Sequence, residues 1–538
     1  MKTLKLNEPT QRKTIGRWSG TLLVAAGMQV LALPHLNAQT KDKQITDSGI
    51  TAVVEKGFKQ EKGVVPDTVD VSTSQGIVTL SGSLDNLLAK ERAVRIAESI
   101  RGVRGVIDQT IVTPVSRSDD EISRDITSAL KQDPATQSSK VTVSVQDAVA
   151  TLAGTVGFYG EKRLATRIAE GVRGVKAVQN NVTISYLTSP SDAQIASDIK
   201  SRLQWDIWIN GDLVKAVVVN GNVTLTGTIG SAISKSRAED DAWVNGVMSV
   251  DDKGVVVAPR TGTATHQEQD YAARSDSDIK KAILASLRLD PRVSAYAPDV
   301  TVEDGGVILG GNVGNLKAKT SAGEDAKDIV GVWRVDNLLQ VKPTAQPTDA
   351  QIESQLKAAL AWDPLIDGDT ITVGVTKRIV HLSGSVDSSF DKSEAQDLAS
   401  RIDGVLSVRN NLKAEPEFSY NNSSYWPYYT YGDWPYYSYY DGGLYNNQVL
   451  NYDYGMYEPP LYMTDDQIKK SIRDEFFWSP FVDNSDIKVS VTGGVATLTG
   501  TVGTRIGMGE IDSDAYQGGA TNVIDQVKLK HHAWWWWW

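Results

Sequence analysis

The stretch Ile77-Val78-Thr79-Leu80-Ser81-Gly82-Ser83-Leu84 is one of six versions of a single phrase that returns along the chain. Apolar and polar residues alternate in it, which predicts a β-strand with one buried face and one face lined by hydroxyl groups. A glycine falls on the apolar face, where the close approach of a packed helix would require it. The six structural glycines are Gly82, Gly154, Gly227, Gly311, Gly384 and Gly500. The sequence therefore predicts six copies of one module.

Each phrase lies within the same order of elements. An alternating run precedes it, as in Val141-Thr142-Val143-Ser144-Val145, and a short turn at Gln146-Asp147 joins the two as a hairpin. Before the hairpin we expect a helix: Thr348 and Thr464 each have a glutamine three residues on, which is a capping box, and pairs such as Asp363-Pro364 end the helix. A second helix with repeated alanines, a Gly-Val turn and a last strand follow. The order is helix, strand, strand, helix, strand.

This order and these phrases resemble the BON domain, named for bacterial osmotically inducible and nodulation proteins. The resemblance implies an α+β fold of six tandem α-β-β-α-β modules, each of about 70 residues and just large enough to fold alone. We expect beads on short linkers, with a continuous stacked solenoid as the alternative. Asp241 and Gly518-Gly519 depart from the second-helix pattern, which predicts that the third and sixth modules are the loosest. The modules span residues 45–114, 118–186, 191–259, 275–343, 348–416 and 464–530.

The first 38 residues have the pattern of a secretory signal peptide. A basic start is followed by an apolar run from Thr21 to Leu33, which is too short to span a bilayer as a helix, and then by Pro34. We expect cleavage after Ala38, with an uncleaved anchor as the alternative. Removing five basic residues and one acidic residue changes the formal net charge from −11 to −15. We expect no transmembrane segment in the mature chain.

The composition excludes several classes of function. The chain has no cysteine, which removes disulfides, thiol nucleophiles and thiolate metal sites. It has five histidines, of which only His531 and His532 are adjacent, and two adjacent ligands do not make a metal site. An acidic chain without a clustered basic face is a poor partner for nucleic acid. No phosphate loop, nucleophile elbow or metal-binding motif is visible. We therefore expect no enzyme activity, no cofactor and no metal.

Three segments do not fit the module. Residues 260–274 are a polar linker, and residues 417–463 hold fourteen of the nineteen tyrosines with no helical or strand period. The bland interpretation of the insert is a disordered linker. The sharper one is an adhesive segment in which Trp426, Tyr428, Trp434 and Tyr436 contact a surface. The 531–538 tail ends in five tryptophans, which suit a membrane–water interface or form an unstructured end.

By resemblance, BON modules act in the bacterial envelope and are associated with phospholipid binding and protection against osmotic stress. We expect a non-catalytic, multivalent, periplasmic protein that contacts lipid or another envelope surface, with outer-membrane association or secretion as alternatives. Because the chain is acidic, binding to anionic lipid would have to use local basic residues. The candidates are Arg101, Arg104, Arg173 and Lys176, beside the Gly-Val turns. The alternative for them is the capping of helix C-termini. Competing hypotheses are an extended scaffold whose aromatic insert binds a protein or glycan, and a holdase for unfolded clients.

Overall fold

The structure is a computed structural model that describes residues 45–60, 68–137, 140–258, 274–343, 346–386, 389–414, 463–482, 486–503, 505–520 and 522–529. The expected signal peptide and its cleavage site, the 531–538 tail, the linker except Arg274 and the aromatic insert except Met463 lie outside the described residues. In this part of the chain, no helix is both long and apolar enough to cross a membrane.

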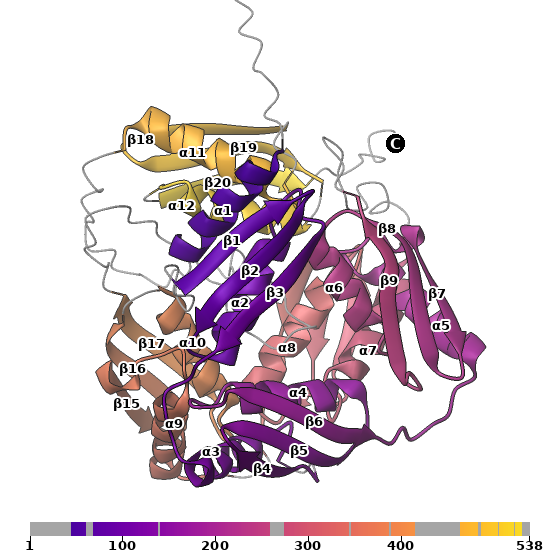
Figure 1. Ribbon diagram of the computed structural model, residues 1–538, viewed down its shortest axis with the longest axis vertical. Helices are drawn as coiled ribbons and strands as arrows, with labels where there is room; N and C mark the ends of the chain where they lie inside the picture. Colours follow the sequence, from indigo (N-terminus) through magenta and orange to yellow (C-terminus); the bar gives the residue numbers. More distant parts are fainter. Residues whose placement is uncertain are drawn as a thin grey trace, which may run out of the picture. The chain divides into compact units, whose positions relative to one another are not determined.

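All six modules show the expected order of elements (Figure 1). The first comprises α1 (Asp47–Gln60), β1 (Val69–Ser74), β2 (Ile77–Leu84), α2 (Leu87–Glu98) and β3 (Gly105–Val112). The second comprises α3 (Asp119–Gln132), β4 (Thr142–Gln146), β5 (Val149–Val156), α4 (Tyr159–Glu170) and β6 (Ala177–Ile184). The third comprises α5 (Asp192–Trp205), the 3-10 turn η2 (Gly211–Leu213), β7 (Val214–Val219), β8 (Asn222–Ile229), α6 (Ala232–Asp241) and β9 (Ser249–Val257).

The second half of the chain repeats the plan. The fourth module comprises α7 (Asp276–Leu289), β10 (Asp299–Glu303), β11 (Gly306–Gly310), β12 (Asn312–Val313), α8 (Leu316–Lys327), β13 (Arg334–Asn337) and β14 (Gln340–Val341). The fifth comprises α9 (Asp349–Trp362), η3 (Gly368–Thr370), β15 (Ile371–Thr376), β16 (Ile379–Val386), α10 (Ser389–Arg401) and β17 (Ser407–Ala414). The sixth comprises α11 (Asp465–Trp478), β18 (Ile487–Thr492), β19 (Val495–Val502), α12 (Arg505–Gln517) and β20 (Asn522–Leu529). Gly518 and Gly519 therefore follow α12 and do not interrupt it, contrary to the expectation.

Each module is a small mixed sheet covered by two helices. In the first, β2 is the central strand, antiparallel to β1 and parallel to β3. Val78 and Leu80 of β2 are fully buried with residues of α1 and α2, whereas the hydroxyl residues Thr79, Ser81 and Ser83 alternate with the buried residues and lie on the other face. The fourth module differs because its sheet is divided after Gly310 into β10-β11-β13 and β12-β14. The predicted alternation thus sets which face of each sheet meets the helices.

The helix signals in the sequence are confirmed. Thr348 and Thr464 form capping boxes with Gln351 and Gln467, and α9 ends at the residue before Asp363-Pro364. The apolar residues that recur at helical spacing in α9, Ile352, Leu356, Ala359 and Leu360, form its buried face.

A second repeated device was missed in the sequence. The first aspartate of each first helix accepts hydrogen bonds from both N–H groups of the hairpin turn, as Asp119 does from Asp147 and Ala148 at 2.9 Å. Both turn residues have a positive φ, so this carboxylate holds a strained turn in place. The equivalent aspartates are Asp47, Asp192, Asp276, Asp349 and Asp465.

The repeat glycine is required for a reason other than the expected helix contact. Gly154 has a φ of +136°, and a Cβ placed there would collide with the carbonyl oxygen of Lys140, just before β4. All six repeat glycines have a positive φ, and in five of them the colliding atom is likewise a backbone oxygen at the start of the partner strand. The hairpin backbone, and not the helix, therefore excludes a side chain.

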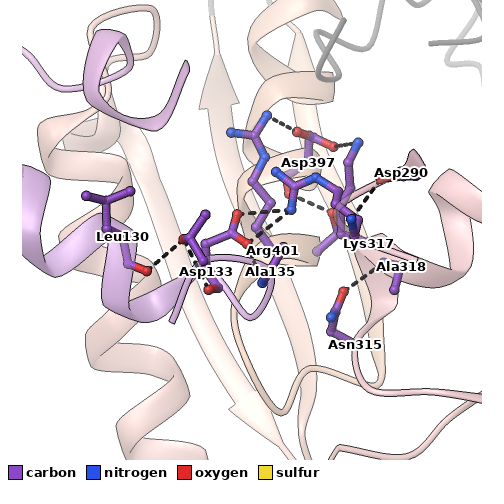
Figure 2. A network of polar contacts seen from close by, with 12 residues as sticks. Leu130, Asp133, Ala135, Asp290, Asn315, Lys317, Ala318, Asp397 and Arg401 are labelled. Atoms are coloured by element: carbon purple, nitrogen blue, oxygen red, sulfur yellow. Dashed lines mark hydrogen bonds and ion pairs between the residues drawn. The ribbon is translucent and has the colours of Figure 1, made fainter. Parts of the chain in front are cut away.

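The modules are not joined by linkers alone, which differs from the expectation of beads and from a linear stack. The Arg292 guanidinium of the fourth module pairs with Asp133 of the second at 3.0 Å. The Lys317 ammonium pairs with Asp397 of the fifth at 2.8 Å (Figure 2). Tyr159 stacks on Trp243 of the third module with the ring centroids 3.9 Å apart. The physical reason is that the ends of the first helices, at Asp133 and Arg292, and the second helices, at Tyr159, Lys317 and Asp397, carry polar and aromatic side chains that pack against another module.

Candidate functional site

Arg173 lies in the turn after the second helix of the second module, where its side chain reaches the fifth module. Its backbone N–H donates to the carbonyl oxygen of Trp362, the last residue of α9, at 2.7 Å. Its Nη2 atom donates to the carbonyl oxygens of Asp363 and Ile366 at 2.8 and 3.0 Å. The guanidinium therefore caps the end of a helix in another module.

Arg101 makes the same contact between the first and sixth modules. Its N–H donates to the carbonyl oxygen of Trp478 at 2.8 Å, and Nη2 donates to those of Ser479 and Val482 at 2.6 and 2.7 Å. The sequence left open whether these arginines bind a surface or cap a helix. The geometry gives them a capping contact, made to a helix that is distant in the sequence.

Arg104 and Lys176 lie three residues further on, and their side chains are exposed. Their N–H groups donate at 2.8 Å to the carbonyl oxygens of Gly76 and Ala148 in the hairpin turns. Each therefore occupies the end of its module where the hairpin turn and the Gly-Val turn meet. We call the residue at this position the tip residue.

The same position in the next three modules carries large apolar side chains. Met248 and Trp333 are 73% and 41% exposed, and Leu406 is partly exposed. Their N–H groups also donate to the hairpin turn, so the backbone geometry is shared. Of these five positions, the sequence pattern pointed only to the basic ones, Arg104 and Lys176. The missed signal was position, two residues after the glycine of each turn.

Buried carboxyl groups are numerous between modules. Burial raises the pKa of Glu394 to about 8 and that of Asp363 to about 6. Burial also raises the pKa of Asp206 and Asp325, which line a cavity of about 40 Å³ between α5, α6, α7 and α8. That volume holds a few water molecules and no organic substrate. In the described ranges, no group of three or more His, Asp or Glu side chains is placed to hold a metal ion.

The four aromatic candidates, Trp426, Tyr428, Trp434 and Tyr436, lie outside the described residues. A contact role for them stays a prediction.

Comparison with known proteins identifies the module. The BON domain family matches residues 46–114, 118–186, 191–259, 275–343, 348–416 and 464–530. The osmotically-inducible protein Y of Escherichia coli (strain K12) is 32% identical over 143 residues, which are 25% of this chain and 71% of that protein. The outer membrane lipoprotein DolP of Haemophilus influenzae is 30% identical over 103 residues, 18% of this chain and 53% of DolP. The match thus spans about half of DolP.

Two solved structures of CdsD, a structural protein of the type III secretion system of Chlamydia trachomatis, are 17% identical to this chain. They cover 39% and 40% of this chain and 93% and 100% of their own, with TM-scores of 0.11 and 0.12. At these scores they do not bear on the arrangement of the modules.

Proposed function

Because this chain belongs to the BON domain family, we propose that it is a non-catalytic, multivalent binding protein of the bacterial envelope that contacts phospholipid through its module tips. The names of the two relatives support a place in the envelope and a link to osmotic stress. The signal-like residues 1–38 support export to the periplasm with cleavage after Ala38. N-terminal sequencing of the exported protein tests this cleavage: an intact Met1 would contradict it.

The tip residues carry the proposal. Five modules present one exposed or partly exposed side chain at the same backbone position, basic in two modules and large and apolar in three. Basic groups attract anionic headgroups, and apolar groups enter the boundary between headgroups and acyl chains. Several weak contacts on one chain give avidity when they engage together.

The net charge sharpens the expected behaviour. A mature chain of −15 is repelled by an anionic surface at long range, so binding depends on the local tips and on salt. We expect recovery with anionic vesicles to increase with added salt if long-range repulsion dominates, and to decrease if the basic tips dominate.

The experiment is flotation of the mature chain, from Gln39 onward, with neutral and anionic liposomes at low and physiological salt. The double variant Arg104→Ser/Lys176→Ser should weaken binding to anionic vesicles by about fivefold per residue, since each basic group near the surface contributes about 1 kcal/mol. Met248→Ser/Trp333→Ser should weaken binding to both vesicle types. Lys131→Ser/Lys200→Ser, which removes two exposed basic residues away from the tips, is the matched control. Absence of flotation under all conditions would exclude lipid binding.

The tyrosine content of the insert favours a second candidate, a scaffold whose insert docks a protein or glycan. Deletion of residues 417–463 separates the two candidates. Flotation that survives the deletion supports the tips, and flotation that is lost with it supports the insert.

A further inference from the structure

The contacts of Arg101 and Arg173 have a third counterpart between the third and fourth modules. The N–H of Val330, in the turn after α8, donates to the carbonyl oxygen of Trp205 at 2.9 Å. Trp205 is the last residue of α5, as Trp362 and Trp478 are the last residues of α9 and α11. One backbone contact therefore occurs three times, always between the end of a first helix and the turn after a second helix.

The residue that ends the first helix separates the modules into two kinds. The third, fifth and sixth modules end this helix in tryptophan and provide the accepting carbonyl oxygen. The first, second and fourth end it in Gln60, Gln132 and Leu289, and among the described residues none of these carbonyl groups accepts a turn N–H from another module. Each module of this second kind instead provides the donating turn.

The tryptophan ring explains why the contact depends on this residue. Trp478 is 7% exposed and packs within the core of the first module. Trp362 packs against the cores of both the second and the fifth modules, and Trp205 against those of the third and fourth. A large apolar ring joins two small cores, while the helix-terminal carbonyl groups beside it gain donors.

We propose that the end of a first helix with its tryptophan and the next four residues, here called the Trp corner, is a recognition site for the second-helix turn of another BON module. In this chain the three Trp corners are used internally, and they pair the first module with the sixth, the second with the fifth and the third with the fourth. The pairs are nested in the sequence. The three contacts thereby fold the chain back on itself. The partner of a Trp corner is the second-helix turn of another BON module, which donates a backbone N–H and, in two of the three contacts, also an arginine side chain.

The absence of cysteine makes a direct test possible in the full-length mature chain. Lys176 and Asp367 are exposed and lie close to the second–fifth contact, three residues after Arg173 and one residue after Ile366. Spin labels on Lys176→Cys/Asp367→Cys should give one short, narrow distance distribution by pulsed electron paramagnetic resonance. A broad distribution at long distances would overturn the pairing.

Variants then test the role of the Trp corner. Trp362→Gln, which places the residue type of the second module's helix end, and Arg173→Ala should each broaden the distribution and shift it to longer distances. Arg173→Ala removes only contacts to the fifth module, so its modules should keep the circular dichroism of the parent. Trp333→Gln changes a tryptophan outside the contacts and should leave the distribution unchanged. If neither Trp362→Gln nor Arg173→Ala moves it, the Trp corner does not direct the pairing.

A mixture of singly labelled chains decides whether the contact is internal. No dipolar signal in the mixture supports pairing within one chain. A short distance in the mixture would show that Trp corners join two copies, and would overturn the nested arrangement.

Discussion

The second–fifth and third–fourth contacts have the same backbone hydrogen bond and the same helix-terminal tryptophan, and they differ in the charged groups beside them. In the first, Arg173 is partly exposed and its charge meets neutral carbonyl groups. In the second, Val330 stands in the place of the arginine, and the nearby charge comes from Arg237, which pairs with Asp206 and, at 2.8 Å, with Asp328. These three side chains are at most 10% exposed. The same backbone contact is thus accompanied by an arginine that donates to carbonyl groups in one case and by a buried arginine–aspartate cluster in the other. The two contacts should therefore respond differently to substitution and to pH.

Arg237→Ala should have the largest effect. It leaves two buried carboxyl groups without their cation, and breaking a buried ion pair from one side costs about 3–5 kcal/mol. Hydrogen exchange at the N–H groups of Ile207 and Val330, which cross the contact, should accelerate accordingly. The N–H of Arg173 is the internal control. Acceleration there as well would mean that the contacts open together.

Arg173→Ala should have a smaller effect on the second–fifth contact. Hydrogen bonds from a charged donor contribute about 1.5–3 kcal/mol, and the change leaves two neutral backbone carbonyl groups, those of the buried residues Asp363 and Ile366, without this donor. It does not leave two buried charges without their cation, as Arg237→Ala does. Exchange at the N–H of residue 173 measures the loss. Arg173→Lys should retain part of the stabilisation, because the ammonium group keeps the positive charge and lacks only the two-pronged donor geometry of the guanidinium. A loss as large as that of Arg237→Ala would contradict the distinction between the contacts.

The pH dependence separates the two contacts further. Burial raises the pKa of Asp325, and among the described residues neither of its carboxylate oxygens has a hydrogen-bond partner. A carboxyl group with a raised pKa binds its proton more tightly in the folded state. Its contribution is therefore complete below the ordinary pKa of about 4 and is lost as the pH rises through the raised value. The opening free energy at Val330, corrected for intrinsic exchange, should fall as the pH is raised above the ordinary carboxyl pKa of about 4. Asp325→Asn should flatten this fall.

The matched change at the other contact is Glu394→Gln in the fifth module, where burial raises the pKa of Glu394 to about 8. The variant should reduce the fall of the opening free energy at the N–H of Arg173 between about pH 4.5 and 8. The fall of the opening free energy at Val330 should stay unchanged. An equal response of both amides to one variant would argue against independent carboxyl groups.

Substitution in an exposed ion pair should have the smallest effect on amide exchange at these contacts. Arg334 pairs with Asp336 on β13, and their side chains are 48% and 32% exposed. Arg334→Ala should change exchange at Val330 by no more than about 1 kcal/mol, because exposed pairs are screened by water and salt. A larger change would mean that the fourth module transmits surface substitutions to its contact.

The module was predictable because its signals are local. Capping boxes, Asp-Pro ends and period-two alternation each act within a few residues, and all of them recur in the structure where the sequence places them. The glycine of the repeat was located correctly, but its cause was wrong. The colliding carbonyl oxygen of Lys140 belongs to a strand whose register cannot be seen from Gly154 alone.

The sequence by itself determined the six modules, their order of elements and the identity of the turn residues. Only the tertiary structure decided that Arg101 caps a buried helix end while Arg104, three residues later, lies exposed at a tip. Both are arginines beside the same Gly-Val turn, so composition and spacing treat them alike. The difference comes from Ser479 and Val482, which are nearly four hundred residues away in the chain and meet Arg101 only when the first and sixth modules pack together.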